Sequence, residues 1–229
     1  MEEEAKEFIQ KHQFSEISPD WNIKVPQKTY ASDMYENISL RLILNGTYGE
    51  NHQYIGTNGA IISTFLALET IKADLIVNIG TCGAWKAHDS YIGDVYWVNQ
   101  TSFHDRRIPL AQYEDFGQQK LRAFEIPDDL KDTFKVASLS TGNSLDITKR
   151  DQEIISMNKA ILKDMEGAAI NEIASLNQTP LILVKAVTDL IDSEIETSEE
   201  FLKNLKYTIS ELNKKMQILI NYLDQKWTI

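Results

Sequence analysis

The chain has 229 residues, of which 42% are hydrophobic and 25% charged. This balance is typical of a globular protein with enough apolar material for one large core. The formal net charge of −11 argues against nucleic acid or an anionic membrane as a partner, because both bind basic surfaces. No apolar run is long enough to span a membrane, and residues 1–4 are too acidic for a signal peptide. The lone cysteine, Cys82, cannot form an internal disulfide, so the sequence predicts a cytoplasmic protein.

The first half of the chain alternates between strand-length apolar runs and a helical pattern. Residues 40–44 predict a strand, and residues 58–71 predict a helix because apolar side chains recur on one face. Residues 74–79 form another apolar run, which predicts a buried strand. The glycines at both ends of residues 80–83 then predict a tight turn. Residues 94–98 predict a further strand, and a polar loop follows it.

The second half repeats the alternation. Residues 134–140 predict a strand and residues 165–176 a short helix. Residues 180–187 are almost continuously apolar, which is typical of a central strand in a parallel sheet. Residues 201–223 predict the longest helix, with apolar side chains at spacings of three and four. The sequence therefore predicts one α/β domain over residues 1–229, a three-layer α/β/α sandwich with a mostly parallel mixed sheet.

Three clusters follow predicted strands at the edge where open α/β sheets bind ligands. They are residues 80–83, His104 with Asp105, and Thr188 with Asp189. The glycine cluster suits a phosphate or cofactor turn, and it resembles the first turn of S-adenosylmethionine-dependent methyltransferases. Its dinucleotide-type glycine pattern is incomplete, so a plain tight turn is the simpler interpretation of this segment alone.

Carboxylates at two of the predicted element ends have both structural and chemical interpretations. Asp164 and Glu166 stand at the mouth of a predicted helix, where they could cap its positive end or bind vicinal sugar hydroxyls. Asp189 could be a turn residue, or a partly desolvated acid whose raised pKa lets it donate a proton. The four histidines and Cys82 lack metal-ligand spacing, so no metal site is predicted.

Taken together, these segments resemble the nucleoside phosphorylase and nucleosidase family, and specifically its methylthioadenosine/S-adenosylhomocysteine nucleosidases. The matching segments occur in order along the chain and cover nearly all of it: MEEEA at 1–5, NIGTCG at 78–83, IGDV at 92–95, STGNSLD at 140–146, KDMEGAA at 163–169 and VKAVTDL at 184–190. FHDRRIP at 103–109 and EEFLKNL at 199–205 are similar to the plant-type branch. A methyltransferase would leave Glu166 and Asp189 without a role.

The resemblance implies a role for each of several residues. Asp189 would be the general acid that protonates N7 of the departing purine. Glu4 would orient and deprotonate the attacking water, with Thr81 helping to hold it. Glu166 would bind the ribose hydroxyls. The remaining implied contacts with the nucleoside come from Met165 under the ribose, Leu145 against the purine, the backbone of Asp146 at the purine edge, and Met1 and Lys185 at the site.

The implied reaction is hydrolysis of the N-glycosidic bond of 5′-methylthioadenosine, and S-adenosylhomocysteine is an open second substrate. No cofactor is implied. The family also implies a role in methionine salvage and a homodimer in which the loop after His104 reaches toward the partner. Hydrolysis is favoured over phosphate-dependent cleavage because no arginine cluster stands near the glycine turns to hold a phosphate.

The chain departs from the family pattern at its start. Relatives carry a complete β-strand before the segment that begins here at Met1, so either the start of this sequence is shortened or this member lacks a central strand. Loss of that strand would leave two strand edges unpaired. Glu4 would then stand on a mobile terminus. This departure motivates an alternative, a nucleoside-binding relative without catalysis. Lys185 also stands where bacterial members usually have arginine.

Overall fold

The computed structural model describes residues 2–18, 21, 23–49 and 52–226. The α-helices are α1 (Glu2–Lys11), α2 (Thr57–Leu66), α3 (Glu114–Gly117), α4 (Lys149–Met157), α5 (Gly167–Leu176) and α6 (Thr197–Lys226). The strands are β1 (Ser15–Ile17), β2 (Lys28–Ser32), β3 (Leu40–Leu44), β4 (Thr47–Tyr48), β5 (His52–Gln53), β6 (Ile76–Ala84), β7 (Val95–Phe103), β8 (Lys120–Arg122), β9 (Lys135–Thr141), β10 (Leu162–Asp164) and β11 (Leu181–Leu190). A π-helical turn, Ala67–Ile71, continues α2.

The main sheet is mixed, and five of its six strands form a closed ring. Its order is β11-β6-β10-β9-β7-β8, and a further pairing between β11 and β7 closes the ring. The two longest ladders, β11–β6 and β7–β9, are parallel, whereas β11–β7 and β10–β6 are antiparallel. Strand β11 therefore forms hydrogen bonds on both of its edges, as its unbroken apolar sequence predicts.

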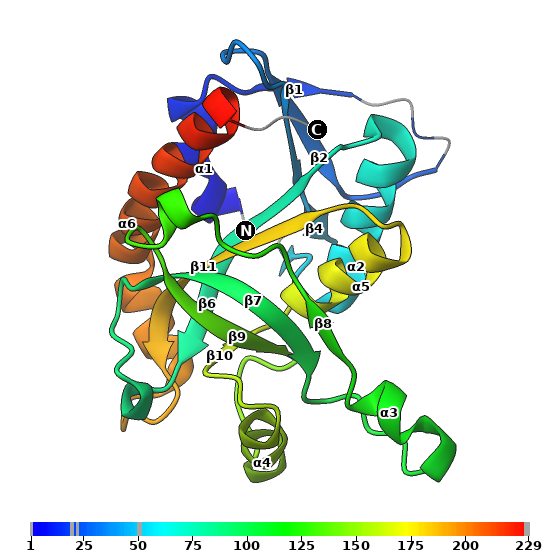
Figure 1. The fold of residues 1–229 in the computed structure, drawn as a ribbon, viewed down its shortest axis with the longest axis vertical. Coiled ribbons are helices and arrows are strands. Elements are labelled where there is room, and N and C mark those ends of the chain that lie inside the picture. The colour runs from blue at the N-terminus through cyan, green and yellow to red at the C-terminus, as the bar shows by residue number, and fades with distance from the viewer. Residues whose placement is uncertain (1, 19–20, 22, 50–51, 227–229) are drawn as a thin grey trace.

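Strand β11 supplies both hydrophobic cores because alternate side chains point to opposite faces of a strand. Ile182 and Val184 belong to the core under α6, which also contains Trp97 of β7. Leu181 and Leu183 belong to the core on the other face, together with residues of α5. Figure 1 shows α6 with α1 on one side of the sheet and α2 with α5 on the other. This arrangement is the predicted three-layer sandwich.

A second, smaller sheet stands beside the main one. It has the order β1-β2-β3, and β4 pairs with β5 in a separate hairpin. Within the described residues, β3 pairs only with β2, and β6 before Gly83 pairs only with β11. One edge of each strand therefore has no strand partner in the described part of the chain.

The predicted turn at residues 80–83 is wrong, because these residues lie inside β6. Gly80 pairs with Lys185 and Gly83 with Asp189 in the parallel ladder to β11. Gly80 and Gly83 leave space for side chains of β11 and do not reverse the chain. A Cβ atom on Gly80 would lie 3.5 Å from Lys185 Nζ, and one on Gly83 would lie 2.6 Å from Asp189 Oδ2.

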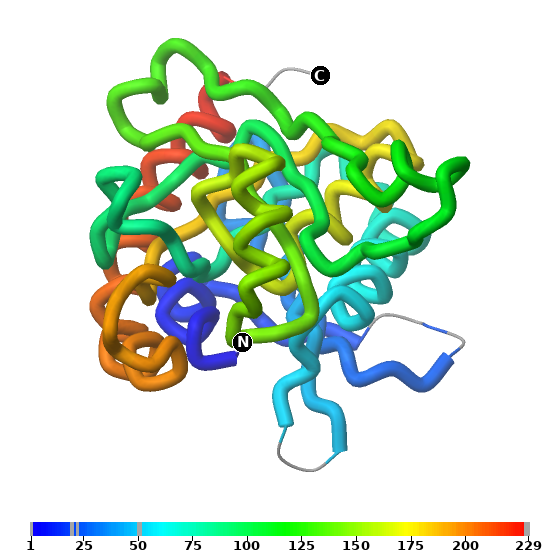
Figure 2. The backbone as a smooth tube through the Cα atoms, turned by 90° about the horizontal axis from the view of Figure 1, so that it is seen from below, coloured from blue at the N-terminus to red at the C-terminus, as the bar shows by residue number. Residues whose placement is uncertain are grey.

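The N-terminal helix α1 lies beside the beginning of α6. Figure 2 shows the two helices next to each other, and a shallow groove is lined by side chains from both. Phe8 of α1 is buried in the same core as Leu212 and Met216 of α6. The contact holds α1 against the body of the protein. Among the described residues, no helix is long and apolar enough to cross a membrane.

Candidate active site

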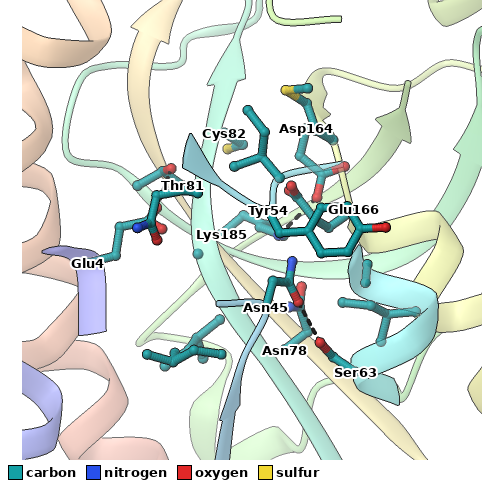
Figure 3. A pocket seen from close by; sticks show the side chains of 18 of the residues that line it. Glu4, Asn45, Tyr54, Ser63, Asn78, Thr81, Cys82, Asp164, Glu166 and Lys185 are labelled. Atoms are coloured by element: carbon teal, nitrogen blue, oxygen red, sulfur yellow. Dashed lines mark hydrogen bonds and ion pairs between the residues drawn. The ribbon is translucent and has the colours of Figure 1, made fainter. Parts of the chain in front are cut away.

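One large cavity, of about 560 Å³, lies between β3 and nearly the whole length of β6, and it extends to the end of β11. Its walls also include residues of α1, α2, α6 and the loop after β9. Figure 3 shows side chains of the cavity wall, among them Glu4 of α1, Thr81 of β6 and Lys185 of β11. Seven of the predicted site residues line this cavity: Glu4, Thr81, Leu145, Met165, Glu166, Lys185 and Asp189. Residues far apart in the sequence thus meet at the predicted edge of the sheet.

Asp189 lies near the carboxyl end of β11 and is 4% exposed. Its Oδ1 accepts a hydrogen bond from the Thr188 hydroxyl at 2.8 Å. Burial raises the pKa of Asp189 above its usual range, and the negative charge of Glu200 adds to the rise, although the Thr188 hydroxyl and the positive charge of Lys163 oppose it. A carboxyl group in this environment is suited to carrying and donating a proton.

Asp164 and Glu166 divide the two roles that the sequence left open. Asp164 Oδ2 accepts a hydrogen bond from the Gly167 N–H at 2.8 Å, and its Oδ1 accepts one from the Thr141 hydroxyl at 2.6 Å. Asp164 thereby caps α5, as expected for a carboxylate at a helix N-terminus. Glu166 is not a side-chain cap of this helix. It is left to face the cavity.

Glu166 is tied to the opposite wall of the cavity by one bond. Its Oε1 accepts a hydrogen bond from the Gly56 N–H at 2.8 Å, just before α2 begins. Burial and the nearby charge of Asp164 raise the pKa of Glu166, whereas Lys185 and the Gly56 N–H lower it. This carboxylate has an oxygen free of protein partners in the described residues, and that oxygen could accept hydroxyl groups of a sugar.

Lys185 lines the cavity, but its ammonium group is already paired. Its Nζ lies 2.9 Å from Asp164 Oδ2, and the two side chains are 2% and 1% exposed. Burial lowers the pKa of Lys185, but the carboxylates of Asp164 and Glu166 outweigh this effect and hold that pKa above its usual range. Lys185 therefore acts first as the counter-charge of buried carboxylates, and its direct contact with a substrate remains a prediction.

Glu4 and Thr81 meet at the other end of the cavity. The Thr81 hydroxyl of β6 donates a hydrogen bond to Glu4 Oε1 at 2.7 Å. Burial raises the pKa of Glu4, whereas the Thr81 hydroxyl and the charge of Lys185 lower it. Helix α1 thus brings a carboxyl group into the cavity. Met1, the other predicted residue of this segment, lies outside the described residues.

The loop after β9 forms the remaining wall. Leu145 lines the cavity and is 44% exposed, so an apolar surface is available there for a flat ligand. Asp146 is exposed and its side chain is not part of the cavity wall. The expected contact of its backbone with a purine remains a prediction. Met165, between the two carboxylates of the KDME segment, lines the cavity as expected.

His104 and Asp105, the third predicted cluster, do not line the cavity. His104 is buried against Gly142, and its Nδ1 lies 3.1 Å from the Ser140 hydroxyl. Asp105 Oδ2 accepts a hydrogen bond from the Asn143 N–H at 2.8 Å. Asn143 in turn accepts hydrogen bonds from the N–H and hydroxyl of Thr57 in the first turn of α2. This cluster supports the wall of the cavity and is not part of its chemistry.

Three cavity residues, Asn45, Asn78 and Lys163, were not among the predicted site residues. Asn45 follows β3 and accepts a hydrogen bond from the Ser63 hydroxyl of α2 at 2.6 Å. Asn78 of β6 has a buried side-chain oxygen without a hydrogen-bond partner among the described residues. Lys163 of β10 donates hydrogen bonds into the loop after β9. Because β10 has only three residues, Leu162–Asp164, no apolar pattern marked Lys163 as a cavity residue. Among the described residues, no His, Cys, Asp or Glu cluster could hold a metal ion.

Comparisons with known proteins show the family of this chain. The family model of the phosphorylase superfamily matches residues 1–223. The chain belongs to the phosphorylase superfamily. Two Arabidopsis thaliana relatives in this superfamily are a 5′-methylthioadenosine nucleosidase, 42% identical over 74% of this chain, and a 5′-methylthioadenosine/S-adenosylhomocysteine nucleosidase, 38% identical over 84% of it. The first match spans 64% of that relative's length and the second 77%.

Solved structures of superfamily members have the same fold. The apo structure of the Arabidopsis thaliana 5′-methylthioadenosine nucleosidase superimposes with a TM-score of 0.95 at 36% identity, covering 99% of this chain and 94% of that chain. A structure of an MTA/SAH nucleosidase gives the same TM-score at 34% identity, covering 99% and 93%. The predicted resemblance to these nucleosidases is therefore confirmed.

Proposed function

We propose that this superfamily member hydrolyses the N-glycosidic bond of 5′-methylthioadenosine, releasing adenine and methylthioribose. One observation carries the proposal: Glu4, Glu166 and Asp189 line a single cavity, and burial raises the pKa of Asp189. Cleavage of a glycosidic bond uses an acid on the leaving group and carboxylates beside the cationic sugar. Two relatives at 42% and 38% identity carry this activity in their names.

The base would lie at the Asp189 end of the cavity. Protonation of a ring nitrogen turns adenine from a poor anionic leaving group into a neutral one, and a carboxyl group with a raised pKa can supply that proton. Leu145 offers an apolar surface for the face of the purine, and the backbone of Asp146 would bind its edge. The proton therefore moves from Asp189 to the purine as the C–N bond breaks.

The ribose would lie over Met165 with its hydroxyls toward Glu166. The negative charge of this carboxylate favours the positive charge that develops on the sugar ring. Lys185 balances the charge of Asp164, so that Glu166 stands beside a neutral pair instead of a second free carboxylate. In this way the ion pair supports the carboxylate that binds the substrate.

Water, and not phosphate, would be the nucleophile. Glu4 can accept a proton from a water held near the Thr81 hydroxyl, which already bonds to it. The cations in the described wall of the cavity are Arg41, Lys163 and Lys185. Arg41 bonds to Asp33, Lys163 to backbone carbonyls and Lys185 to Asp164. A phosphate ion would have to break one of these pairs to bind.

The deciding experiment is adenine release from 5′-methylthioadenosine in phosphate-free buffer, followed by chromatography. We expect release without phosphate and no acceleration when phosphate is added. Release that requires phosphate would replace this proposal with phosphorolysis. Binding of adenosine analogues without any turnover would replace it with the non-catalytic alternative. The same assay with S-adenosylhomocysteine tests the second substrate, whose larger thioalkyl group must fit the open end of the cavity.

We also propose a cytoplasmic homodimer that acts in methionine salvage. The reaction would recycle the thioribose part of a by-product of S-adenosylmethionine chemistry. The segment after His104 presents Leu110, Tyr113 and Phe116, which are 53%, 44% and 45% exposed. Apolar side chains gathered on one loop suit a protein contact. A monomer by light scattering at assay concentration would contradict the dimer.

A further inference from the structure

The buried lysine of β10 has no role in the proposed reaction as described so far. Lys163 is 6% exposed and lines the cavity. Its ammonium group donates hydrogen bonds to the carbonyl oxygens of Ser144 and Leu145, at 2.6 and 3.0 Å. A buried ammonium group costs free energy unless its hydrogen bonds are made. These two hydrogen bonds hold the loop that contains Leu145 against β10.

The same lysine faces the proposed general acid across a glycine. Lys163 pairs with Gly83 between β10 and β6, and Gly83 pairs with Asp189 between β6 and β11. Residues in register on neighbouring strands lie side by side. Because Gly83 has no side chain, nothing from β6 stands between Lys163 and Asp189 in this row. A Cβ atom on Gly83 would lie 2.6 Å from Asp189 Oδ2.

We propose that Lys163 is a positioning residue that couples the two parts of the base subsite. It holds the Leu145 loop through two carbonyl oxygens, and it faces the Asp189 carboxyl across Gly83. The loop determines where the purine lies, and Asp189 supplies the proton to that purine. This inference rests on the proposed hydrolysis, because it assigns Lys163 to the base-binding end of that site.

The charged groups around Lys163 and Asp189 determine how Lys163 changes the pKa of Asp189. The charged groups that act on Asp189 are Lys163 from β10 and Glu200 from α6. Lys163 lowers the pKa of Asp189, whereas Glu200 raises it. Four carboxylates raise the pKa of Lys163, those of Asp189, Asp164, Asp146 and Asp151, and the charge of Lys163 in turn lowers the pKa of His104. Loss of the lysine charge therefore makes Asp189 a weaker acid, and the alkaline limb of the activity profile moves to higher pH.

The test compares three substitutions at Lys163 with one matched control. Lys163→Met removes both the charge and the hydrogen bonds, Lys163→Gln keeps a donor for the carbonyl oxygens, and Lys163→Arg keeps the charge. Lys135→Met is the control, because Lys135 also donates a hydrogen bond to a backbone carbonyl, that of Asp89, in addition to its bond to the Asp94 carboxylate, but lies outside the cavity wall. Thermal unfolding of each variant confirms that it is folded.

Two measurements separate positioning from a merely structural role. In Lys163→Met we expect adenine to bind about tenfold more weakly by calorimetry, and the alkaline limb of kcat/KM to shift up by about half a pH unit or more. Lys163→Gln should show the pH shift with a smaller loss of adenine affinity, and Lys163→Arg should keep the limb of the wild type. Lys135→Met should change neither quantity.

The outcomes also distinguish this inference from the proposed function. Wild-type protein that releases no adenine would overturn the proposed function itself. An active wild type, with adenine affinity and pH limb the same in Lys163→Met as in Lys135→Met, would overturn the role of Lys163 alone. As an independent check, Gly83→Ala should displace the Asp189 carboxyl and reduce kcat by more than it weakens adenine binding.

Discussion

The two ends of the cavity are built in different ways. At one end Asp189 is part of β11, a strand that is hydrogen-bonded on both edges and buried over nearly its whole length. At the other end Glu4 stands on the first helix, which packs on α6 through a few side chains and reaches β6 through the Thr81 hydroxyl. Strand register fixes the position of the proposed acid, whereas helix docking fixes the position of the residue proposed to activate water. We therefore expect substitutions at the two ends to differ in both size and kind.

The largest effect on turnover is expected for substitution of Asp189, at the end of the cavity that strand register fixes. Asp189→Asn keeps the shape of the side chain but removes its proton, which is needed only as the bond breaks. We expect kcat to fall by about 10³-fold, within the range for loss of a general acid, with little change in ligand affinity. Steady-state kinetics with 5′-methylthioadenosine and calorimetry with adenine measure the two quantities.

A matched control for this substitution is Asp33→Asn, which alters an exposed carboxylate that bonds to Ser39 and Arg41. It should leave kcat unchanged. An Asp189→Asn enzyme with wild-type turnover would show that the acid lies elsewhere.

The second-largest effect is expected on stability, when the buried ion pair between Lys185 and Asp164 is broken. Lys185→Met leaves Asp164 buried without its counter-ion, so we expect a loss of about 3–5 kcal/mol in the free energy of unfolding. Urea denaturation measures it. The exposed pair of Lys226 with Asp129 provides the control, because Lys226→Met should cost less than about 1 kcal/mol. Equal losses in the two variants would contradict the importance of the buried pair.

A smaller effect on turnover is expected at the end of the cavity where Glu4 stands on α1. Thr81→Val removes the hydroxyl that bonds to Glu4 but keeps the volume of the side chain. One hydrogen bond to a charged group contributes about 1.5–3 kcal/mol, so turnover should fall by about 10-fold or more while the melting temperature changes little. Parallel measurements of kcat and thermal unfolding test this split. A large loss of stability would mean that the bond holds α1 in place.

The smallest effect concerns stability against pH. Because burial raises the pKa of Asp189, the folded protein binds a proton that the unfolded chain has already released. The contribution of Asp189 to stability is thus present below its unfolded pKa and is lost as pH rises through its folded pKa. Above that range, Asp189→Asn should be more stable than the wild type, as urea titrations at several pH values would show. A variant that is less stable throughout would contradict the assigned shift.

Much of the fold could be predicted because the strands of the main sheet are apolar and the helices have a clear period. The run at residues 180–187 identified β11, and the spacing of Leu205, Leu212 and Leu219 identified α6. The glycine segment of β6 was misread because glycine also occurs where a neighbouring side chain needs room, and only strand pairing distinguishes the two uses. The short strands β1 and β8 were missed because three residues are too few to show a period. Helix α4 was missed because Ile155 is its only buried apolar residue, so it has no apolar face.

The site was predictable where the resemblance supplied a motif, and less so elsewhere. The cavity brings together Glu4, Glu166 and Asp189, which are distant in the sequence. Sequence alone did not separate Asp164 as the helix cap from Glu166 as the cavity carboxylate, because both positions suit a helix N-terminus. The role of Lys163 depends on a β10–β6–β11 row that arises from tertiary pairing.

The closed ring of strands has a consequence for how the protein acquires its activity. The β11–β6 and β11–β7 ladders join segments from distant parts of the chain, and such long-range pairings are slow to form. Asp189 reaches Gly83 only once the β11–β6 ladder has formed. A refolding chain would therefore regain most of its helix content before any adenine is released, and catalysis would report the completion of the native topology.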